Sequence, residues 1–422
     1  MPNYKVVDTG RLDAAMTATA DAIREKTSGT DPIPWNAETG FAEAVAGITG
    51  SGTAVPVLMK DVNFYDYDGT RLYSYTVEEA AALTELPPLP TQPGLICQGW
   101  NWTLDGIKAM GRAVDVGAMY ITDDGETRIY ITLNEGRTSP SLACCPNGTV
   151  TVDWGDGTEP NFLTGTDTSK SGWKQTPRHN YAAPGDYVIT LTVDGQMALY
   201  GDSATYSAVL CHAVNYDDRN LNRAYLRSVR KIELGNGITS INAYTFHSCY
   251  GLKTITVPYG VTTFDTYAFY NCDELSEIVI PNSVTNINTY AFSGCTSVSG
   301  IIIPESITKL EQAIFYSMRG LGNIVIPDSI TSIASNAFRY CYNITNIIIP
   351  GSVASIGATT FDGCYGVRYY DFTRHTAVPE LSNVNAFNTI AADCEIRVPA
   401  ALADAWKAAT NWATYADYIV GV

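Results

Sequence analysis

Apolar residues in the second half of the chain recur at a fixed interval of 23 positions. The phenylalanines that mark this interval are Phe246, Phe269, Phe292, Phe315, Phe338 and Phe361. A cysteine series keeps the same phase, at Cys249, Cys272, Cys295, Cys341 and Cys364, and Met318 takes the place of one cysteine. Because a unit this short cannot bury its apolar face alone, the pattern predicts stacked coils that share one core, a solenoid over residues 229–372.

The sequence of each unit predicts the same three secondary-structure elements. A short strand is expected at Ile-x-Ile-Pro, a second extended stretch at Val-Thr-x-Ile, and a turn of helix at Ala-Phe-x-x-Cys. The cysteines are interpreted as small buried side chains. Open ends would expose the core, so we expect the preceding β module to cover one end. Residues 373–422 are expected to cap the other, with a helix at 399–409 and with Trp406 and Trp412 over the stack.

This repeating phrase resembles the BspA-type leucine-rich repeats, and the resemblance covers all six units. Since the Phe, Pro and Cys series build the core, specificity is expected at the variable positions. Tyrosine offers contact area and a hydrogen-bonding tip at low entropic cost, so the tyrosines of the solenoid near the phenylalanines are candidate ligand-binding residues. They are Tyr244, Tyr250, Tyr267, Tyr270, Tyr290, Tyr316, Tyr340, Tyr342 and Tyr365.

A second variable series lies in the predicted strands, where the residue between two inward aliphatic side chains points outward. It reads Thr256, Val279, Ile302, Val325 and Ile348. A solvated face favours Thr, Lys or Glu, so the four apolar members indicate a contact between chains in an oligomer. The alternative is that β-branched residues occur there only because they suit a strand.

Residues 1–50 predict two short helices. Leu12, Met16 and Ile23 follow the spacing of an amphipathic helix. Such a narrow stripe cannot close a core within this segment. We therefore interpret it as an anchoring or oligomerisation segment, with docking onto the rest of the chain as the alternative.

A small β module is predicted at residues 54–113. Two strand-like runs flank Asp68 and Gly69, which together are a strong hairpin signal, and a short helix is expected at 77–83. With the later Gly-Trp at 99–100, this order resembles the β-grasp-like repeats of Gram-positive surface proteins.

A second module is predicted at residues 120–200, where apolar and polar positions alternate as in half-buried antiparallel strands. Its Trp-Gly-Asp-Gly-Thr phrase at 154–158 and the later His179 to Tyr187 resemble the polycystic-kidney-disease (PKD) type of immunoglobulin-like sandwich. Calcium binding by Asp153, Asp156 and Glu159 is the less favoured interpretation, because the same acids suit a turn. The predicted fold is thus multidomain and mainly β: a helical segment, a β-grasp-like module, a PKD-like sandwich and a leucine-rich-repeat solenoid with a helical cap.

Composition excludes some classes of function. A net charge of −17 and a pI near 4.6 argue against a nucleic-acid ligand. Membrane insertion is not expected, since no long apolar run occurs. The cysteines are too dispersed for a disulfide scaffold or a zinc site, so no metal is expected. No catalytic motif or pair of carboxylates across a cleft is found, which predicts a protein without enzymatic activity or cofactor.

The phrases that begin at Ala20 and Val398 resemble tail-associated proteins of phages and prophages from gut Firmicutes. The first residues also lack the apolar run of a signal peptide, so release by lysis is expected. The leading hypothesis is a tail fibre-like receptor-binding protein in the virion. Its solenoid would bind a host-surface glycan or protein, and its N-terminus would join other tail proteins in a homo-oligomer. The alternatives are a BspA-like adhesin on a bacterial surface and a purely structural tail component.

Overall fold

The computed structural model describes residues 62–66, 70–93, 95–100, 102–110, 114–122, 124–135, 138–168, 175–201, 210–211 and 227–422. The predicted helical stripe of Leu12, Met16 and Ile23 lies outside these residues. The chain divides into two compact units. The first includes residues up to Tyr120, and the second comprises Ile121–Val422 together with Pro93–Ile96.

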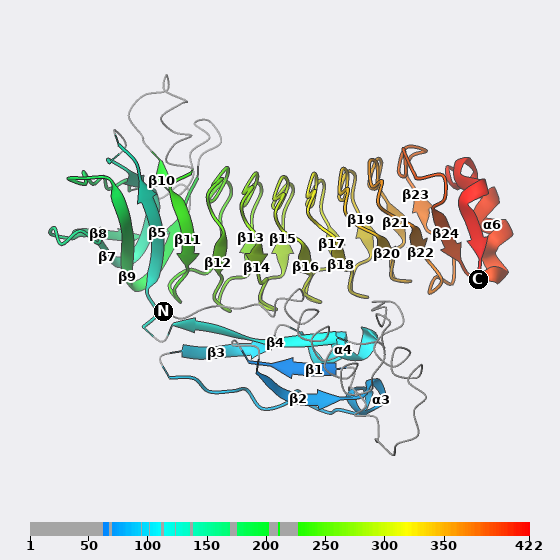
Figure 1. Cartoon of the computed structure of the whole chain (residues 1–422), viewed down its shortest axis with the longest axis horizontal. Coiled ribbons are helices and arrows are strands. Elements are labelled where there is room, and N and C mark those ends of the chain that lie inside the picture. Colours follow the sequence, from blue (N-terminus) through cyan, green and yellow to red (C-terminus); the bar gives the residue numbers. More distant parts are fainter. Residues whose placement is uncertain are drawn as a thin grey trace, which may run out of the picture. The chain divides into compact units, whose positions relative to one another are not determined.

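The first unit contains a four-stranded sheet with two helices, α3 (Val77–Ala81) and α4 (Leu104–Met110) (Figure 1). Its strands are β1 (Val62–Tyr65), β2 (Arg71–Tyr75), β3 (Leu95–Trp100) and β4 (Val114–Thr122), in the order β2-β1-β4-β3. Phe64 and Trp100 meet edge to face in its core, with ring centroids 4.9 Å apart. Strand β4 lies beyond residue 113, so this sheet extends past the end of the predicted module.

The second unit begins with antiparallel strands that pair in the order β5-β9-β7-β8. They are β5 (Thr127–Leu133), β7 (Cys144–Asp153), β8 (Asn161–Thr166) and β9 (Gly185–Leu199), beside a small pair of strands, β6 (Ser141–Leu142) and β10 (Leu210–Cys211). Buried and half-buried residues alternate along the whole of β5. The period-two pattern therefore identified these strands correctly.

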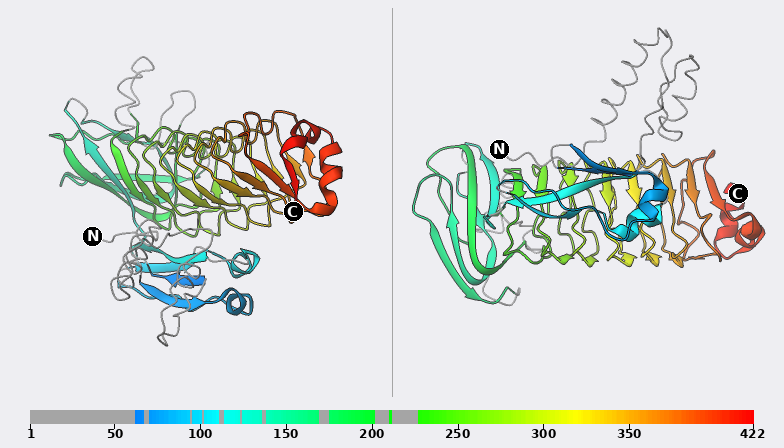
Figure 2. Two further views of the ribbon diagram at one scale, coloured as in Figure 1. Left: turned by 45° about the vertical axis from the view of Figure 1, so that its right-hand side comes forward. Right: turned by 90° about the horizontal axis from the view of Figure 1, so that it is seen from below.

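The antiparallel strands continue directly into the solenoid. Strand β11 (Val229–Glu233) pairs antiparallel with β5 on one side and parallel with β12 (Thr254–Thr256) on the other. Figure 2 shows the coils in a row, with the antiparallel strands at one end and the helical cap at the other. Because β5 occupies the open edge of β11, the first coil is covered by backbone pairing, at the end where a cap was expected.

Two columns of short parallel strands run along the solenoid. The first comprises β11, β12, β14 (Glu277–Ile278), β16 (Gly300–Ile302), β18 (Asn323–Val325), β20 (Asn346–Ile348), β22 (Tyr369–Asp371), β24 (Glu395–Val398) and β25 (Ile419–Gly421). The second comprises β13 (Thr263–Phe264), β15 (Asn286–Ile287), β17 (Lys309–Leu310), β19 (Ser332–Ile333), β21 (Ser355–Ile356) and β23 (Glu380–Leu381). Successive coils pair in register, as in Ile255 with Ile278 and Ile347 with Tyr370.

The segment around each phenylalanine differs from the prediction, because it is a series of hydrogen-bonded turns and no helix. Tyr267 and Asn271, which flank Phe269, have φ of 58° and 56°. An α-helix cannot pass through such left-handed residues. The amide of Phe269 instead donates to the carbonyl of Ala291 in the next coil at 2.8 Å. We call this side of the solenoid, formed by residues 242–251 and the equivalent turns up to 357–366, the Phe-turn edge.

The phenylalanines form one continuous stack in the core, as their spacing predicts. Neighbouring ring centroids from Phe246 to Phe361 lie 5.3 to 6.2 Å apart, and Phe387 continues the series 5.1 Å beyond Phe361. The repeat cysteines are buried, as expected. The thiol of Cys295 donates to the carbonyl of Phe269 at 3.1 Å, and Cys272, Cys341 and Cys364 make the equivalent bond.

The last coil is closed by a short helix, α6 (Ala403–Ala408), between two 3-10 helices, η1 (Ala400–Leu402) and η2 (Trp412–Tyr418). Trp406 and Trp412 are fully buried, as the prediction of a tryptophan cap requires. Their rings lie 5.5 Å from each other, and Trp412 is also 5.5 Å from Phe387. The aromatic stack therefore ends against two tryptophans.

We expect Phe292→Ala to lower the free energy of unfolding by about 3–5 kcal/mol, because it removes a fully buried ring from the middle of the stack. Urea unfolding of the full chain, followed by tyrosine and tryptophan fluorescence, measures this change. The control is Tyr365→Ala, whose side chain is 58% exposed and whose loss should cost only the stacking on Tyr342, about 0.5–1.5 kcal/mol. Equal losses in the two variants would contradict the continuous core.

Candidate functional site

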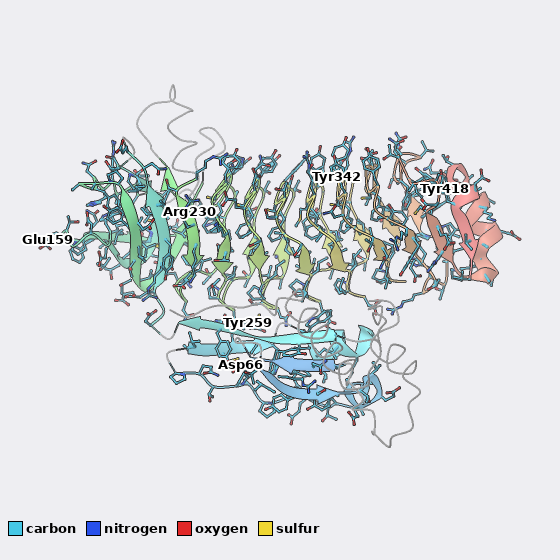
Figure 3. The ribbon with its side chains drawn as sticks, viewed as in Figure 1. Asp66, Glu159, Arg230, Tyr259, Tyr342 and Tyr418 are labelled. Carbon is cyan, nitrogen blue, oxygen red and sulfur yellow. The ribbon has the colours of Figure 1, made fainter. Side chains whose placement is uncertain are left out.

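All nine candidate tyrosines lie on the Phe-turn edge. Figure 3 labels Tyr342 on this edge, while Tyr259 lies on the opposite edge of the coils. Relative to the phenylalanine of its own coil, each tyrosine occupies one of four repeat positions. The structure joins most of them in two groups of ring contacts, one in the first three coils and one in the last three.

The first group is built on a ladder of tyrosines two residues before the phenylalanine. Tyr244 and Tyr267 stack with centroids 5.1 Å apart, and Tyr267 and Tyr290 stack at 4.9 Å with an interplanar angle of 8°. Tyr270 meets Tyr267 edge to face at 5.2 Å and stacks on His247 at 5.0 Å. We call these five residues the amino-terminal tyrosine cluster.

The tyrosines of this ladder occupy a strained backbone position. Tyr244, Tyr267 and Tyr290 have φ of 61°, 58° and 59°. The same repeat position later holds Ala313, Asn336 and Thr359, also at positive φ. A non-glycine residue in this region costs about 1–3 kcal/mol, and Asn tolerates it best. The turn therefore imposes the φ angle and does not require an aromatic ring.

The second group contains four tyrosines and two arginines. Tyr340 contacts Tyr316 at 5.5 Å and Tyr342 at 6.2 Å, and Tyr342 stacks on Tyr365 at 5.6 Å. The guanidinium groups lie over two of these rings, Arg319 at 5.5 Å from the Tyr342 centroid and Arg339 at 4.6 Å from that of Tyr340. We call these six residues the carboxy-terminal tyrosine cluster.

The burial of Tyr316 raises the pKa of its phenol above the ordinary value, so the hydroxyl stays protonated.

Tyr250, the ninth candidate, belongs to neither cluster. Its ring packs against the core and carries the guanidinium of Arg227 at 5.4 Å.

Sequence reasoning missed His247, Arg319 and Arg339. Each occupies a repeat position that carries tyrosine in another coil: Arg319 aligns with Tyr342, and His247 and Arg339 align with Tyr270 and Tyr316. Aligning the six units column by column would have found them, whereas a search for tyrosine alone passes over them.

The outward strand series keeps its alternation in the structure. Thr256, Val279, Ile302, Val325 and Ile348 are all half-buried, while the adjacent Ile301 and Ile347 are buried. Beyond Ile348 the same column continues with Asp371 and Arg397, which are paired in register. The apolar stripe thus ends where charged residues begin.

The acids of the Trp-Gly-Asp-Gly-Thr turn are engaged within the turn itself. Asp153 accepts a hydrogen bond from the amide of Gly155 at 2.8 Å. Asp156 accepts from Thr158, and its other oxygen lies 2.7 Å from Nε2 of His179. Burial opposes the charge of Asp156, but these hydrogen bonds outweigh it and lower the pKa of its carboxyl group. The two acids therefore stabilise the turn in this structure.

Other kinds of site were sought across the same residues. Within the part of the chain that the structure describes, no group of three or more His, Cys, Asp or Glu is placed to hold a metal ion. None of the described helices has the length and apolar character that a membrane crossing requires. A cavity of about 380 Å³ lies in the cap, between residues 378–382 and 409–412. Two carbonyls there already accept hydrogen bonds from Asn411 and Trp412.

The repeats also match a known family. The matched ranges are 224–343 and 262–390, in six copies, and the family is described as the BspA type leucine rich repeat region. Residues 224–390 are a BspA-type leucine-rich repeat region. This region makes up less than half of the chain, and no curated protein matches the sequence.

Three solved leucine-rich-repeat structures are similar to part of this chain. A leucine rich cell surface protein from Faecalibacterium prausnitzii is 31% identical, with a TM-score of 0.32, over 34% of this chain and 38% of that one. The T. pallidum leucine rich repeat protein is 26% identical, with a TM-score of 0.33, over 35% and 68%. A leucine-rich repeat protein from Bacteroides ovatus is 20% identical, with a TM-score of 0.32, over 39% and 47%. The chain spans less than half of the first and third.

Burial of His247 makes stability depend on pH. It lowers the pKa of the imidazole to about 4, from 6.5 for an exposed histidine. As the pH falls, His247 therefore takes up a proton at a higher pH in the unfolded chain than in the folded one. The free energy of unfolding decreases by about 3 kcal/mol between pH 6.5 and pH 4. Urea unfolding at pH 7 and at pH 4.5 measures this loss. We expect His247→Gln to show a smaller drop between the two pH values than the unmodified chain. An equal decrease in the two proteins would contradict the role of His247. Burial also lowers the pKa of His375, but this residue is present in both proteins and contributes equally to both decreases.

Proposed function

We propose that the chain is a non-enzymatic adhesion protein that binds a glycan or a protein on a cell surface through its BspA-type solenoid. The binding surface is the Phe-turn edge. The observation that supports this most directly is the ladder of Tyr244, Tyr267 and Tyr290 at backbone positions that tyrosine disfavours.

Neither the turn nor the core explains these tyrosines. Asn336 meets the same backbone requirement at lower cost, and the three rings are half-buried on the edge and lie outside the phenylalanine stack. Ring stacking returns only about 0.5–1.5 kcal/mol per pair. A residue whose type does not suit its backbone conformation, and which lies on an accessible surface, is typical of a functional position. Stacked phenols offer flat apolar faces and hydroxyl groups, which suits sugars and protein side chains alike.

The family match favours display on a bacterial surface over a place in a phage tail. The tail-fibre hypothesis rests on the phrases at Ala20 and Val398. The first lies outside the described residues, and the second belongs to the cap. The surface adhesin is therefore the version that we propose, with the modules at 54–113 and 120–200 as β-grasp-like and PKD-like spacers. A tail protein would use the same binding edge.

We further propose that the half-buried stripe of Val279, Ile302, Val325 and Ile348 joins chains into a homo-oligomer. Ile302→Lys places a charge at the centre of this stripe and is expected to shift the protein toward monomer in sedimentation velocity at micromolar concentration. The matched control, Thr308→Lys, adds the same charge at an exposed position of the same coil and should change nothing. A monomeric unmodified chain would rule out this contact.

Replacing the ladder tests the binding edge. We expect the triple variant Tyr244→Asn, Tyr267→Asn, Tyr290→Asn to lose binding while its free energy of unfolding changes by less than about 1 kcal/mol per site. Lost ring stacking and relieved backbone strain are of similar size and opposite sign. The measurements are retention on a glycan array and on immobilised surface proteins, together with urea unfolding.

The control is Tyr259→Asn, which removes an exposed tyrosine from the opposite edge of the coils. It should retain the full binding of the unmodified chain. If the triple variant binds as well as the control, the ladder is not the binding surface. If the unmodified chain binds neither glycans nor proteins, the purely structural role is favoured.

A further inference from the structure

The charge of the Phe-turn edge varies along the solenoid. The turn at 265–274 holds three acids and no arginine, whereas the last three turns hold Arg319 and Arg339 beside two acids. The position after the repeat cysteine holds Asp273 in the second coil. Two coils later the same position, which there follows Met318, holds Arg319. The position after the phenylalanine holds His247 and Tyr270 early and Arg339 late. The whole chain carries a net charge of −17, so two neighbouring guanidinium groups among tyrosines stand out against an acidic surface.

Arg319 presents an exposed positive charge on this edge, where Asp273, two coils earlier, lies within its electrostatic reach. Its side chain is exposed, and its guanidinium lies 5.5 Å from the ring centroid of Tyr342. Across the residues that the structure describes, the ion pairs do not include Arg319. A cation held over an aromatic face keeps its outer N–H groups directed at solvent, where they can meet an anion.

Arg339 is held in one orientation by its neighbours. Its Nε donates to the carboxylate of Asp362 at 2.8 Å, and one terminal nitrogen donates to the Tyr340 hydroxyl at 2.9 Å. Asp362 is itself 5% exposed and accepts further hydrogen bonds from Asn388 and Thr389. Arg339 is therefore a positioning residue, which fixes the ring of Tyr340 beside Tyr342.

We propose that the carboxy-terminal tyrosine cluster binds an anionic glycan, an inference that rests on the proposed function of this edge. A sugar ring stacks on the outer face of Tyr365, and the acidic group of a neighbouring sugar in the same glycan pairs with Arg319, which lies over the ring of Tyr342. Tyr365 is 58% exposed, so one face of the stacked pair is open to a ligand. Flat rings favour a pyranose over an acidic peptide, whose extended backbone gains most from a strand edge or a groove.

The test compares two probes that differ only in charge. The full chain is titrated with polygalacturonate, which carries a carboxylate on each sugar, and with its methyl-esterified form, which has the same backbone without the charge. We expect tight, salt-sensitive binding of polygalacturonate and weak binding of the ester. Arg319→Gln is expected to weaken binding of polygalacturonate roughly three- to tenfold and to reduce its salt dependence. The matched control Arg374→Gln removes the same charge from another exposed arginine and should leave binding unchanged.

Two further probes identify the chemistry that is recognised. A poly(glycerol phosphate) teichoic acid carries phosphate but no sugar ring, so if it binds as tightly as polygalacturonate, with the same dependence on Arg319, the sugar component is wrong. Polyglutamate that binds equally well overturns the sugar component.

The outcomes also separate this inference from the proposed function. If the ester binds as tightly as the acid, and Tyr342→Ala and Tyr365→Ala abolish both, the edge is a glycan-binding surface and the anionic preference is wrong. If none of these variants affects any probe, neither the site nor its charge preference stands. If no anionic probe binds, the anionic preference is wrong, whatever the ladder variants do on the array.

Discussion

Each coil is fixed to the next at its buried phenylalanine. At Phe269 three contacts meet: the ring stacks between Phe246 and Phe292, the amide donates to Ala291 of the next coil, and the carbonyl accepts the thiol of Cys295. A buried backbone group without a partner would cost about 1–3 kcal/mol. One residue per coil thus satisfies its own backbone and sets the spacing of the stack. Each of the two columns of strands contributes only two or three residue pairs between successive coils and follows this spacing.

The exception to this arrangement coincides with the boundary between the two tyrosine clusters. In the coil of Phe315 the cysteine is replaced by Met318 and the buried alanine by Ile314. Phe292 and Phe315 lie 6.2 Å apart, the widest step among the phenylalanine contacts. Larger side chains explain this step, since a close-packed core cannot absorb extra volume without separating its layers. The tyrosine ladder also ends here, at Ala313, so the two clusters rest on differently spaced parts of one core.

Sequence period was sufficient to predict most of the solenoid, and local backbone geometry accounts for what it missed. A fixed interval of Phe and Cys determines which side chains face inward, so the stack, the buried thiols and the tryptophan cap could be predicted. The turns could not, because positive φ at Tyr267 and Asn271 leaves no mark in hydrophobic pattern. Pairing of β11 with β5 also joins strands about 100 residues apart, a distance over which periodicity carries no information.

The candidate site was predictable to the extent that it follows the repeat. All nine tyrosines gather on one edge because residues at equal repeat positions must stack in a column. Their grouping depends on which columns are adjacent, and only the structure gives that. Tyr340 contacts Tyr316 and Tyr342 although the three stand at different repeat positions. Arg339 joins them because the buried Asp362 lies one coil away and orients its guanidinium group. The residues of the core can therefore be located from their order along the sequence. The Phe-turn edge is instead formed by side chains from neighbouring coils, which are 23 residues apart in sequence.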